Sequence, residues 1–146
     1  MSTTIRFRMS EGADDLAPSK AHSDDAGFDL RAREAVALEP GQRAMVPSGL
    51  FLELPEGWEG QVRPRSGLAA KKGITILNAP GTIDAGYRGE VCVILYNTGS
   101  EILEIARGDR IAQLVIQQLP EVSLVPADRL NDSHRGAGGF GSTGVN

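Results

Sequence analysis

Residues 78–91 read NAPGTIDAGYRGEV and join two segments with strong strand patterns. On the N-terminal side, residues 73–77 alternate with a period of two, and on the C-terminal side residues 91–96 form an apolar run rich in β-branched side chains. Both patterns predict β-strands. Pro80 and Gly81 favour a type II turn over residues 79–82, because proline presets φ and glycine accepts a positive φ. The chain is therefore predicted to double back here.

The same connection carries a carboxylate, a phenol and a guanidinium, from Asp84, Tyr87 and Arg88. Taken alone, these residues are also typical of a solvated turn in which Arg88 pairs with Glu90 on the surface. The interpretation of this connection therefore depends on the rest of the chain.

The composition predicts one all-β domain. The chain has 146 residues, of which 40% are hydrophobic and 5% aromatic, with 18 glycines and 8 prolines spread along its length. Short apolar segments alternate with turns at a spacing of about ten residues, which is typical of a sandwich, jelly roll or barrel. Besides the two segments above, they lie at 5–9, 28–32, 36–38, 45–46, 50–54, 102–105 and 111–116.

The charge and the single cysteine limit the possible partners and compartment. A net charge of −4 and a pI near 5.2 argue against nonspecific binding to nucleic acid or to acidic membranes. No stretch approaches the ~20 apolar residues that a membrane-spanning helix needs. Cys92 is the only cysteine, so no intrachain disulfide can form. We expect a soluble, cytoplasmic protein.

One short helix is predicted between Ser66 and Gly73. Ser66 is a good N-cap, the following residues favour a helix, and Gly73 suits the position after its end. The free N–H groups of its first turn, with Arg65 and the Ser66 hydroxyl, would form a pocket for a phosphate. A simple connecting helix explains the pattern equally well. Farther along, Gln113 interrupts an apolar strand, so its amide is expected to bond to backbone or to a ligand.

The C-terminal segment forms no packed element by itself, because it is rich in glycine. Residues 136–141 match G-x-G-x-x-G, but no strand precedes them, which excludes a dinucleotide-binding fold. The segment carries a cation, a ring and two hydroxyls, as a lid over a nucleotide would, although a disordered tail is the alternative. We predict a β domain over residues 1–126 and a flexible arm over 127–146.

Five segments, in order along nearly the whole chain, resemble the five sequence motifs of the trimeric deoxyuridine triphosphatases (dUTPases). Each is weak by itself, but five in order at this spacing are highly specific. Phe28 stands where the family also has tyrosine or another apolar residue. The segments are Ala26–Leu30, Pro64–Ala69, Gly81–Glu90, Gly108–Leu114 and Arg135–Gly144.

The resemblance implies a jelly-roll-like β-barrel that assembles as a homotrimer and hydrolyses dUTP to dUMP and pyrophosphate with Mg²⁺. Each active site would be shared by three subunits, with the arm of one chain closing a pocket made by the other two. Such a dUTP diphosphatase lowers dUTP, which prevents uracil incorporation into DNA, and supplies dUMP for thymidylate synthesis.

The resemblance also implies roles for individual residues. Asp84 is the expected general base for the water that attacks the α-phosphorus, and Asp29 would act through water near a metal held mainly by the triphosphate. Tyr87 would pack on the deoxyribose and exclude a 2′-hydroxyl. Other expected substrate contacts are, for the uracil, Asn78, Thr82, Ile83, Cys92 and Phe140 and, for the phosphates, Arg65, Ser66, Gly67, Gln113, Arg135, Gly141, Ser142 and Thr143.

Two alternatives share the same fold. A dCTP deaminase would need a proton-shuttling carboxylate aimed at the cytosine ring. A catalytically silent nucleotide-sensing trimer would be expected to lack Asp84, Arg135 or the arm, and all three are present in this sequence.

Overall fold

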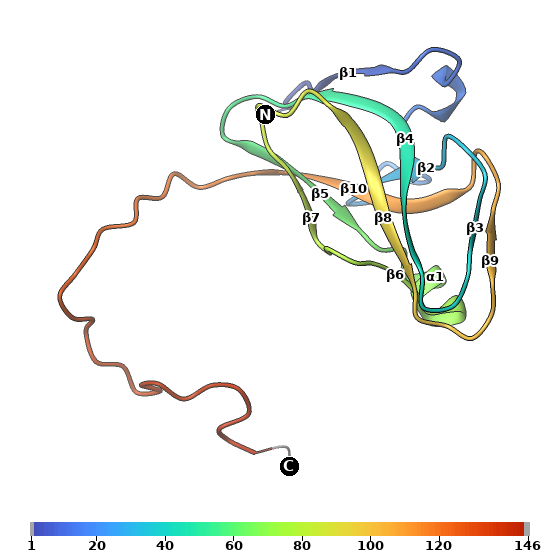
Figure 1. The fold of residues 1–146 in the computed structure, drawn as a ribbon. Coiled ribbons are helices and arrows are strands. Elements are labelled where there is room, and N and C mark those ends of the chain that lie inside the picture. Colours follow the sequence, from blue (N-terminus) through green and yellow to red (C-terminus); the bar gives the residue numbers. More distant parts are fainter. Residues whose placement is uncertain (1, 145–146) are drawn as a thin grey trace.

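The computed structural model describes residues 2–144, and in that part the fold is all-β and jelly-roll-like with one short α-helix, as predicted. Figure 1 shows the elements in chain order. They are β1 (Arg6–Met9), the 3-10 turn η1 (Asp14–Leu16), β2 (Phe28–Arg31), β3 (Val36–Leu38), β4 (Arg43–Glu53), β5 (Trp58–Arg63), α1 (Ser66–Lys72), β6 (Ile74–Ile76), β7 (Gly81–Ile83), β8 (Glu90–Asn97), β9 (Leu103–Ile105) and β10 (Arg110–Gln118).

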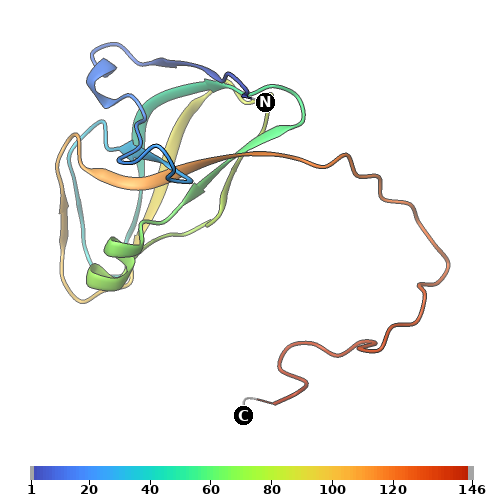
Figure 2. The ribbon, with the colours of Figure 1, turned by 180° about the vertical axis from the view of Figure 1, so that it is seen from behind.

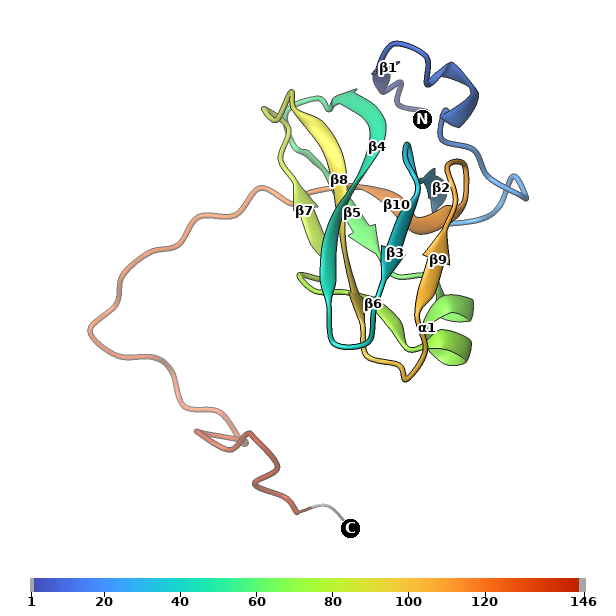
Figure 3. The same cartoon turned by 45° about the vertical axis from the view of Figure 1, so that its right-hand side comes forward.

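Two four-stranded antiparallel sheets form the body. The first sheet has the order β1-β4-β8-β6 and the second has the order β2-β10-β5-β7. The short pair β3 and β9 closes one side, where the two strands run next to each other in Figure 3. Most sheet neighbours are far apart in the sequence, so the fold depends on long-range pairing.

The core lies between the sheets and follows the alternation of the strands. In β8, Val91, Val93 and Leu95 point inward and are almost fully buried, while the residues between them are half-buried. From the facing sheet, Ile111 and Leu114 of β10 belong to the same cluster. Burial of each such side chain contributes about 1.5–3 kcal/mol to the free energy of folding.

Asn97 ends β8 and is completely buried. Its Nδ2 donates to the carbonyl oxygens of Leu38 (2.8 Å) and Glu101 (2.9 Å), and its Oδ1 accepts from the N–H of Gly99 at 2.9 Å. One amide thereby joins β8 to β3 and closes the turn toward β9.

A β-bulge interrupts the pairing of β4 with β8 between Pro47 and Phe51. Gly49 has a φ of +76°, which L side chains rarely adopt, so the bulge requires glycine there. The Ser48 hydroxyl donates to the Val91 carbonyl and accepts from the N–H of Leu50. These bonds satisfy a buried polar side chain and hold the bulge against the start of β8.

The connection over residues 78–91 differs from the prediction in one respect. β6 and β8 pair antiparallel, as expected for a chain that doubles back. The prediction of a type II turn over residues 79–82 is wrong, because Gly81 does not have a positive φ. Gly81 instead begins β7, which pairs with β5. The chain therefore leaves the first sheet, adds a strand to the second sheet, and returns.

The helix begins one residue earlier than expected. Arg65 is the N-cap residue and Ser66 is the first helical residue, so the predicted side-chain cap from Ser66 is absent. Gly73 has a left-handed conformation with φ +69°, and its N–H donates to the carbonyl of Ala69. This end confirms the predicted glycine stop.

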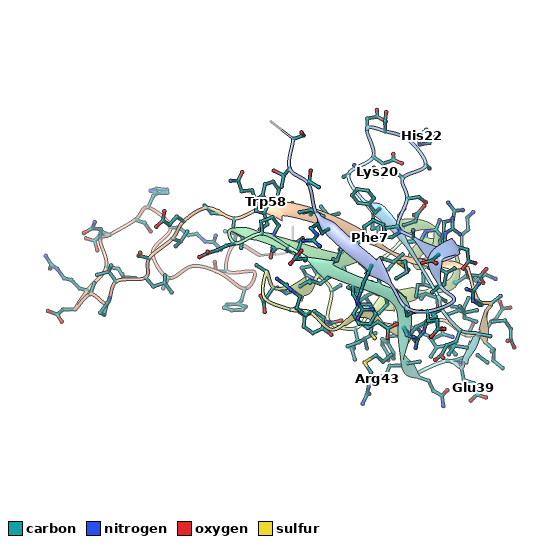
Figure 4. All side chains as sticks on the ribbon, turned by 90° about the horizontal axis from the view of Figure 1, so that it is seen from above. Phe7, Lys20, His22, Glu39, Arg43 and Trp58 are labelled. Carbon is teal, nitrogen blue, oxygen red and sulfur yellow. The ribbon has the colours of Figure 1, made fainter. Side chains whose placement is uncertain are left out.

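The segment after β10 extends away from the body. Its last backbone hydrogen bond to the body joins the N–H of Leu119 to the carbonyl of Gly57 at 2.8 Å, and the later backbone bonds in the described arm are local. Figures 1 and 2 show the arm leaving the second sheet and curling through open space, and Figure 4 shows it departing near Trp58. The division at residue 126 stays a prediction, and residues 145–146 of the arm lie outside the described residues.

Candidate active site

A cavity of about 380 Å³ opens beside β7, which is the edge strand of the second sheet. Its walls come from β4, β6 and β8 of the first sheet and from β5 and β7 of the second. Five residues predicted to contact the base or sugar line it, namely Asn78, Thr82, Ile83, Tyr87 and Cys92. The structure therefore brings this group of predicted site residues together.

The ring of Tyr87 is folded back over Gly89 at the mouth of this cavity. The tyrosine hydroxyl donates to the carbonyl oxygen of Glu90 at 2.8 Å, and a Cβ built at position 89 would overlap the hydroxyl. The N–H of Tyr87 donates to the carbonyl of Asp84, and Arg88 Nη1 donates to the carbonyl of Ala85 at 2.7 Å. These bonds define a compact loop from residue 84 to residue 89.

Asp84 follows directly after Ile83 at the end of β7 and is exposed. It is not among the residues that line the cavity, although its neighbour Ile83 is. Within residues 2–144 its carboxylate makes no hydrogen bond or ion pair with another side chain or backbone group. A carboxylate held at the rim of a cavity in this way can bind and orient a water molecule.

Cys92 lies on β8 in the wall of the cavity. Burial raises the pKa of its thiol above the usual value, and the nearby Glu90 carboxylate raises that pKa further. The group is therefore a protonated thiol at neutral pH. Its position agrees with a packing contact to a ligand rather than with a nucleophile.

A second group of predicted residues meets at the start of β10. Gln113 pairs with Asp29 on β2, and its Nε2 donates to the carbonyl of Pro64 at 2.9 Å, which confirms the expected bond to backbone. Arg65 Nη1 donates to the carbonyl of Arg110 at 3.1 Å, and Arg110 Nη1 lies 3.8 Å from Asp29 Oδ2. Asp29, Arg65 and Gln113 thus lie in one neighbourhood, and none of them lines the cavity.

Ser66 and Gly67 extend this second group along the first turn of α1. Both residues are exposed, and a Cβ built at Gly67 would meet no atom within 4 Å. Gly27 is a member of this neighbourhood that the sequence did not single out. A Cβ at Gly27 would lie 2.9 Å from Gln113 Oε1, so glycine is needed for the amide to occupy its place.

The arm residues lie away from both groups in the single chain. Phe140 is fully exposed, and Arg135 Nε donates to the carbonyl of Gly138 within the arm. The remaining predicted arm contacts, Gly141, Ser142 and Thr143, are also exposed. Their assignment to a neighbouring subunit's site stays a prediction.

The described residues contain no group of three or more His, Cys, Asp or Glu side chains arranged to bind a metal ion. Asp29 is the acidic residue at the second group, and its side chain retains 21% exposure.

Within residues 2–144, no helix has the length and apolar character required to cross a bilayer.

Sequence comparison identifies the family. A family model described as dUTPase matches residues 15–144. This chain belongs to the dUTPase family. A deoxyuridine 5′-triphosphate nucleotidohydrolase of Caulobacter vibrioides is 54% identical over 97% of this chain and 94% of that protein. The predicted family membership is thereby confirmed.

Solved dUTPase structures share the fold. A mutant of the Staphylococcus bacteriophage 80alpha dUTPase, solved with dUpNHpp, superimposes with a TM-score of 0.84 at 30% identity and covers 99% of this chain and 100% of that one. A mutant dUTPase from phage phi11 of S. aureus, described with a structural Mg(II) ion, has a TM-score of 0.77 at 29% identity over 87% of this chain and 98% of that one. The jelly-roll-like dUTPase fold is common to all three.

Glu90 also lines the cavity, and sequence reasoning did not assign it or its partners Gly49 and Arg33 to the site. Glu90 Oε1 accepts from the N–H of Gly49 at 2.8 Å and lies 3.5 Å from Arg33 Nη1. The alternative interpretation, a surface pair of Arg88 with Glu90, is not seen in the described residues, where Arg88 donates to the loop carbonyls of Ala85 and Tyr87. No local pattern indicates these contacts, since the partners are 41 and 57 residues away from Glu90.

Proposed function

We propose that this dUTPase family member hydrolyses dUTP to dUMP and pyrophosphate. The observation that carries the proposal is the cavity beside the β7–β8 loop, which places Asn78 and Tyr87 in its wall and Asp84 at its rim. The volume of about 380 Å³ suits a nucleoside. The curated relative and the phage enzyme solved with dUpNHpp, a dUTP analogue, support the same activity.

The cavity wall accounts for selection of the base and sugar. Asn78 offers both a donor and an acceptor to the edge of uracil, and the backbone from Thr82 to Asp84 adds fixed donors and acceptors. Cys92 and Ile83 narrow the space beside the ring, which excludes the extra methyl group of thymine. Tyr87 packs against the deoxyribose and leaves no volume for a 2′-hydroxyl.

Asp84 is the proposed general base. Its exposed carboxylate accepts a proton from water and aligns that water with the α-phosphorus, so that the attacking oxygen approaches opposite the pyrophosphate leaving group. The bond between the α-phosphorus and the bridging oxygen breaks, and pyrophosphate carries away the electron pair. Because Asp84 directly follows β7, its backbone is anchored to the sheet, which limits the positions that the carboxylate can take and lowers the entropic cost of orienting the water.

The phosphates are assigned to the second group and the arm. Arg65 supplies a guanidinium, Gln113 an amide, and Ser66 with Gly67 the free N–H groups of the first turn of α1. Arg135 would reach the γ-phosphate, and Phe140 would stack on uracil. Gly141, Ser142 and Thr143 would complete the phosphate contacts when the arm closes.

The layout of these residues supports a site made by more than one chain. Arg65, Ser66, Gly67 and Gln113 are not among the residues that line the base cavity, and Phe140 of the arm is fully exposed. The outer face of the first sheet presents Met45 and Leu77, which are 69% and 51% exposed, on either side of Ile94 on β8. An apolar row of this kind suits burial against another copy. We propose a homotrimer in which neighbouring chains complete each site.

Mg²⁺ is the proposed cofactor. Asp29 is a single, partly exposed carboxylate next to the guanidinium of Arg110. Because Mg²⁺ retains several waters and favours phosphate oxygens, Asp29 suits an outer-sphere role, in which it binds waters of the ion. The ion would supply charge neutralisation at the triphosphate. Its removal by a chelator should therefore abolish turnover while the fold persists. We place the activity in the cytoplasm, where it would keep dUTP low and supply dUMP.

The test is pyrophosphate release from dUTP, dCTP, dTTP and UTP with Mg²⁺. We expect selective cleavage of dUTP, and a loss of about a thousandfold or more in kcat for Asp84→Asn with binding of dUMP retained. Asp24→Asn, an exposed substitution in the loop before β2, is the matched control. Tight dUTP binding without turnover would indicate a sensor, and ammonia release from dCTP would indicate a deaminase.

A further inference from the structure

Glu90 connects the ring of Tyr87 to the interior of the first sheet. Its carbonyl oxygen accepts from the Tyr87 hydroxyl at 2.8 Å, and its Oε1 accepts from the N–H of Gly49 at 2.8 Å. Oε1 also lies 3.5 Å from Arg33 Nη1, and the side chain is only 20% exposed. One residue thus contacts the cavity tyrosine with its backbone and the β4 bulge with its side chain.

The far end of this connection is rigid. Gly49 is buried in the bulge, and its carbonyl accepts from the N–H of Ser10 at 2.7 Å. The N–H of Arg33 donates to the carbonyl of Pro47 at 2.8 Å, and its guanidinium also reaches the Ser10 hydroxyl. The Glu90 carboxylate is therefore bound to backbone that cannot shift without disturbing the core.

The near end lacks comparable support. Tyr87 is 46% exposed and lies in a loop with glycines on both sides, and its hydroxyl has one hydrogen bond, to Glu90. A half-exposed ring on such a loop can adopt other rotamers at little cost. Its fixed place in the cavity wall depends on where the Glu90 backbone is held.

We propose that Glu90 is a positioning residue for Tyr87 and thereby sets the preference for deoxyribose over ribose. This inference rests on the proposed hydrolysis of dUTP and assigns part of its sugar selectivity. Glu90 acts through the tyrosine and does not contact the reacting atoms. When its side-chain bond to Gly49 is lost, the start of β8 relaxes, the ring moves, and a 2′-hydroxyl gains room.

Two substitutions separate the length of the side chain from its charge. Glu90→Gln keeps an oxygen acceptor at the same reach, whereas Glu90→Asp keeps the charge but is one carbon shorter and cannot reach the N–H of Gly49. Glu53→Asp is the matched control, because Glu53 pairs with Arg6 on the outer edge of the first sheet. Steady-state kinetics on dUTP and UTP give the ratio of kcat/KM for the two substrates.

We expect Glu90→Asp to lower the dUTP/UTP ratio by about tenfold or more, mainly through better use of UTP, and Glu90→Gln to retain it within about 1.5-fold. A purely structural role would lower both kcat/KM values alike and leave the ratio unchanged, which would overturn the inference. If Glu90→Asp does not fold, Arg33→Met, which removes the second partner of Oε1, should lower the ratio about threefold. An unchanged dUTP/UTP ratio in Arg33→Met would also reject the positioning role of Glu90.

Calorimetric binding of dUMP and UMP separates the two proposals. If the native chain does not cleave dUTP, the proposed function fails, but a preference for dUMP that weakens in Glu90→Asp still supports the positioning role. If dUMP and UMP bind the native chain equally, the positioning role is rejected whatever the turnover of dUTP.

Discussion

The ring of Tyr87 occupies space that a side chain at position 89 would need, because a Cβ built on Gly89 would overlap the tyrosine hydroxyl. Gly89 does not have a positive φ, so its requirement is one of space rather than of backbone conformation. The loop therefore depends on glycine here because the aromatic ring lies against the backbone.

Gly89→Ala should displace the Tyr87 ring and lower the ratio of kcat/KM for dUTP over UTP by about tenfold. Gly86→Ala is the matched control in the same loop, since a Cβ at Gly86 meets nothing within 4 Å. In Gly86→Ala the ratio of kcat/KM for dUTP over UTP should remain within about twofold of the native value. Equal effects of the two alanines in steady-state assays would show that the ring does not depend on the space at position 89.

The thiol of Cys92 should react slowly with iodoacetamide near neutral pH. Burial raises its pKa, so the thiolate is scarcer than in an exposed cysteine, and the rate should climb as the pH rises past the usual thiol range. Saturating dUMP should slow alkylation by about tenfold, because Cys92 lines the cavity. As the only cysteine, it can be followed by mass spectrometry of the intact chain. Reaction at the rate of the unfolded chain, unaffected by dUMP, would contradict this placement.

Asn97→Ala should cost about 3 kcal/mol in the free energy of unfolding. The substitution leaves the buried carbonyl of Leu38 and two further backbone groups without their partners. Thr98→Ala is the control, because its exposed hydroxyl makes one bond to Gly73, and its cost should stay below about 1 kcal/mol. Denaturant unfolding at equal protein concentration measures both, and similar midpoints for the two variants would argue against the role of Asn97.

Removal of residues 127–146 should leave the β body intact while reducing kcat/KM for dUTP by about a hundredfold or more. The described arm makes only local backbone bonds beyond Leu119, so its loss removes no support from the sheets. Circular dichroism should therefore be unchanged in its strand signal. Phe140→Ala keeps the arm and should weaken dUMP binding by about 1–3 kcal/mol through lost stacking. Full activity of the shortened chain would contradict the proposed role of the arm as a lid over the active site.

The strands that the sequence predicted share one property, an apolar pattern that a single buried face or a buried core imposes. β8 and β10 were found in this way. β5 was missed because it contains charged and amide side chains around Gly60, and its assignment depends on pairing with β10 and β7. β7 was missed because proline and glycine indicate a turn locally, although Gly81 here begins a strand.

The candidate site was predicted more completely by resemblance than by local chemistry. Most of the cavity residues fall within one loop and its flanking strands β6, β7 and β8, whereas Met45 and Val62 come from β4 and β5. Glu90 and Gly49 could not be paired from the sequence, because the bulge in β4 that joins them has no distinctive local pattern. The requirement for glycine at position 27 could not be predicted either, because it comes from the side chain of Gln113 on another strand.

The passage of the chain from β6 to β7 to β8 gives the cavity walls from both sheets. A nucleoside in that space would contact both layers at once and would brace them against sliding or separation. Binding and cohesion of the sandwich are then thermodynamically linked, so that occupied protein resists unfolding in proportion to ligand concentration. By the same linkage, a distant substitution that loosens the contact between layers would weaken nucleotide affinity without touching the nucleotide.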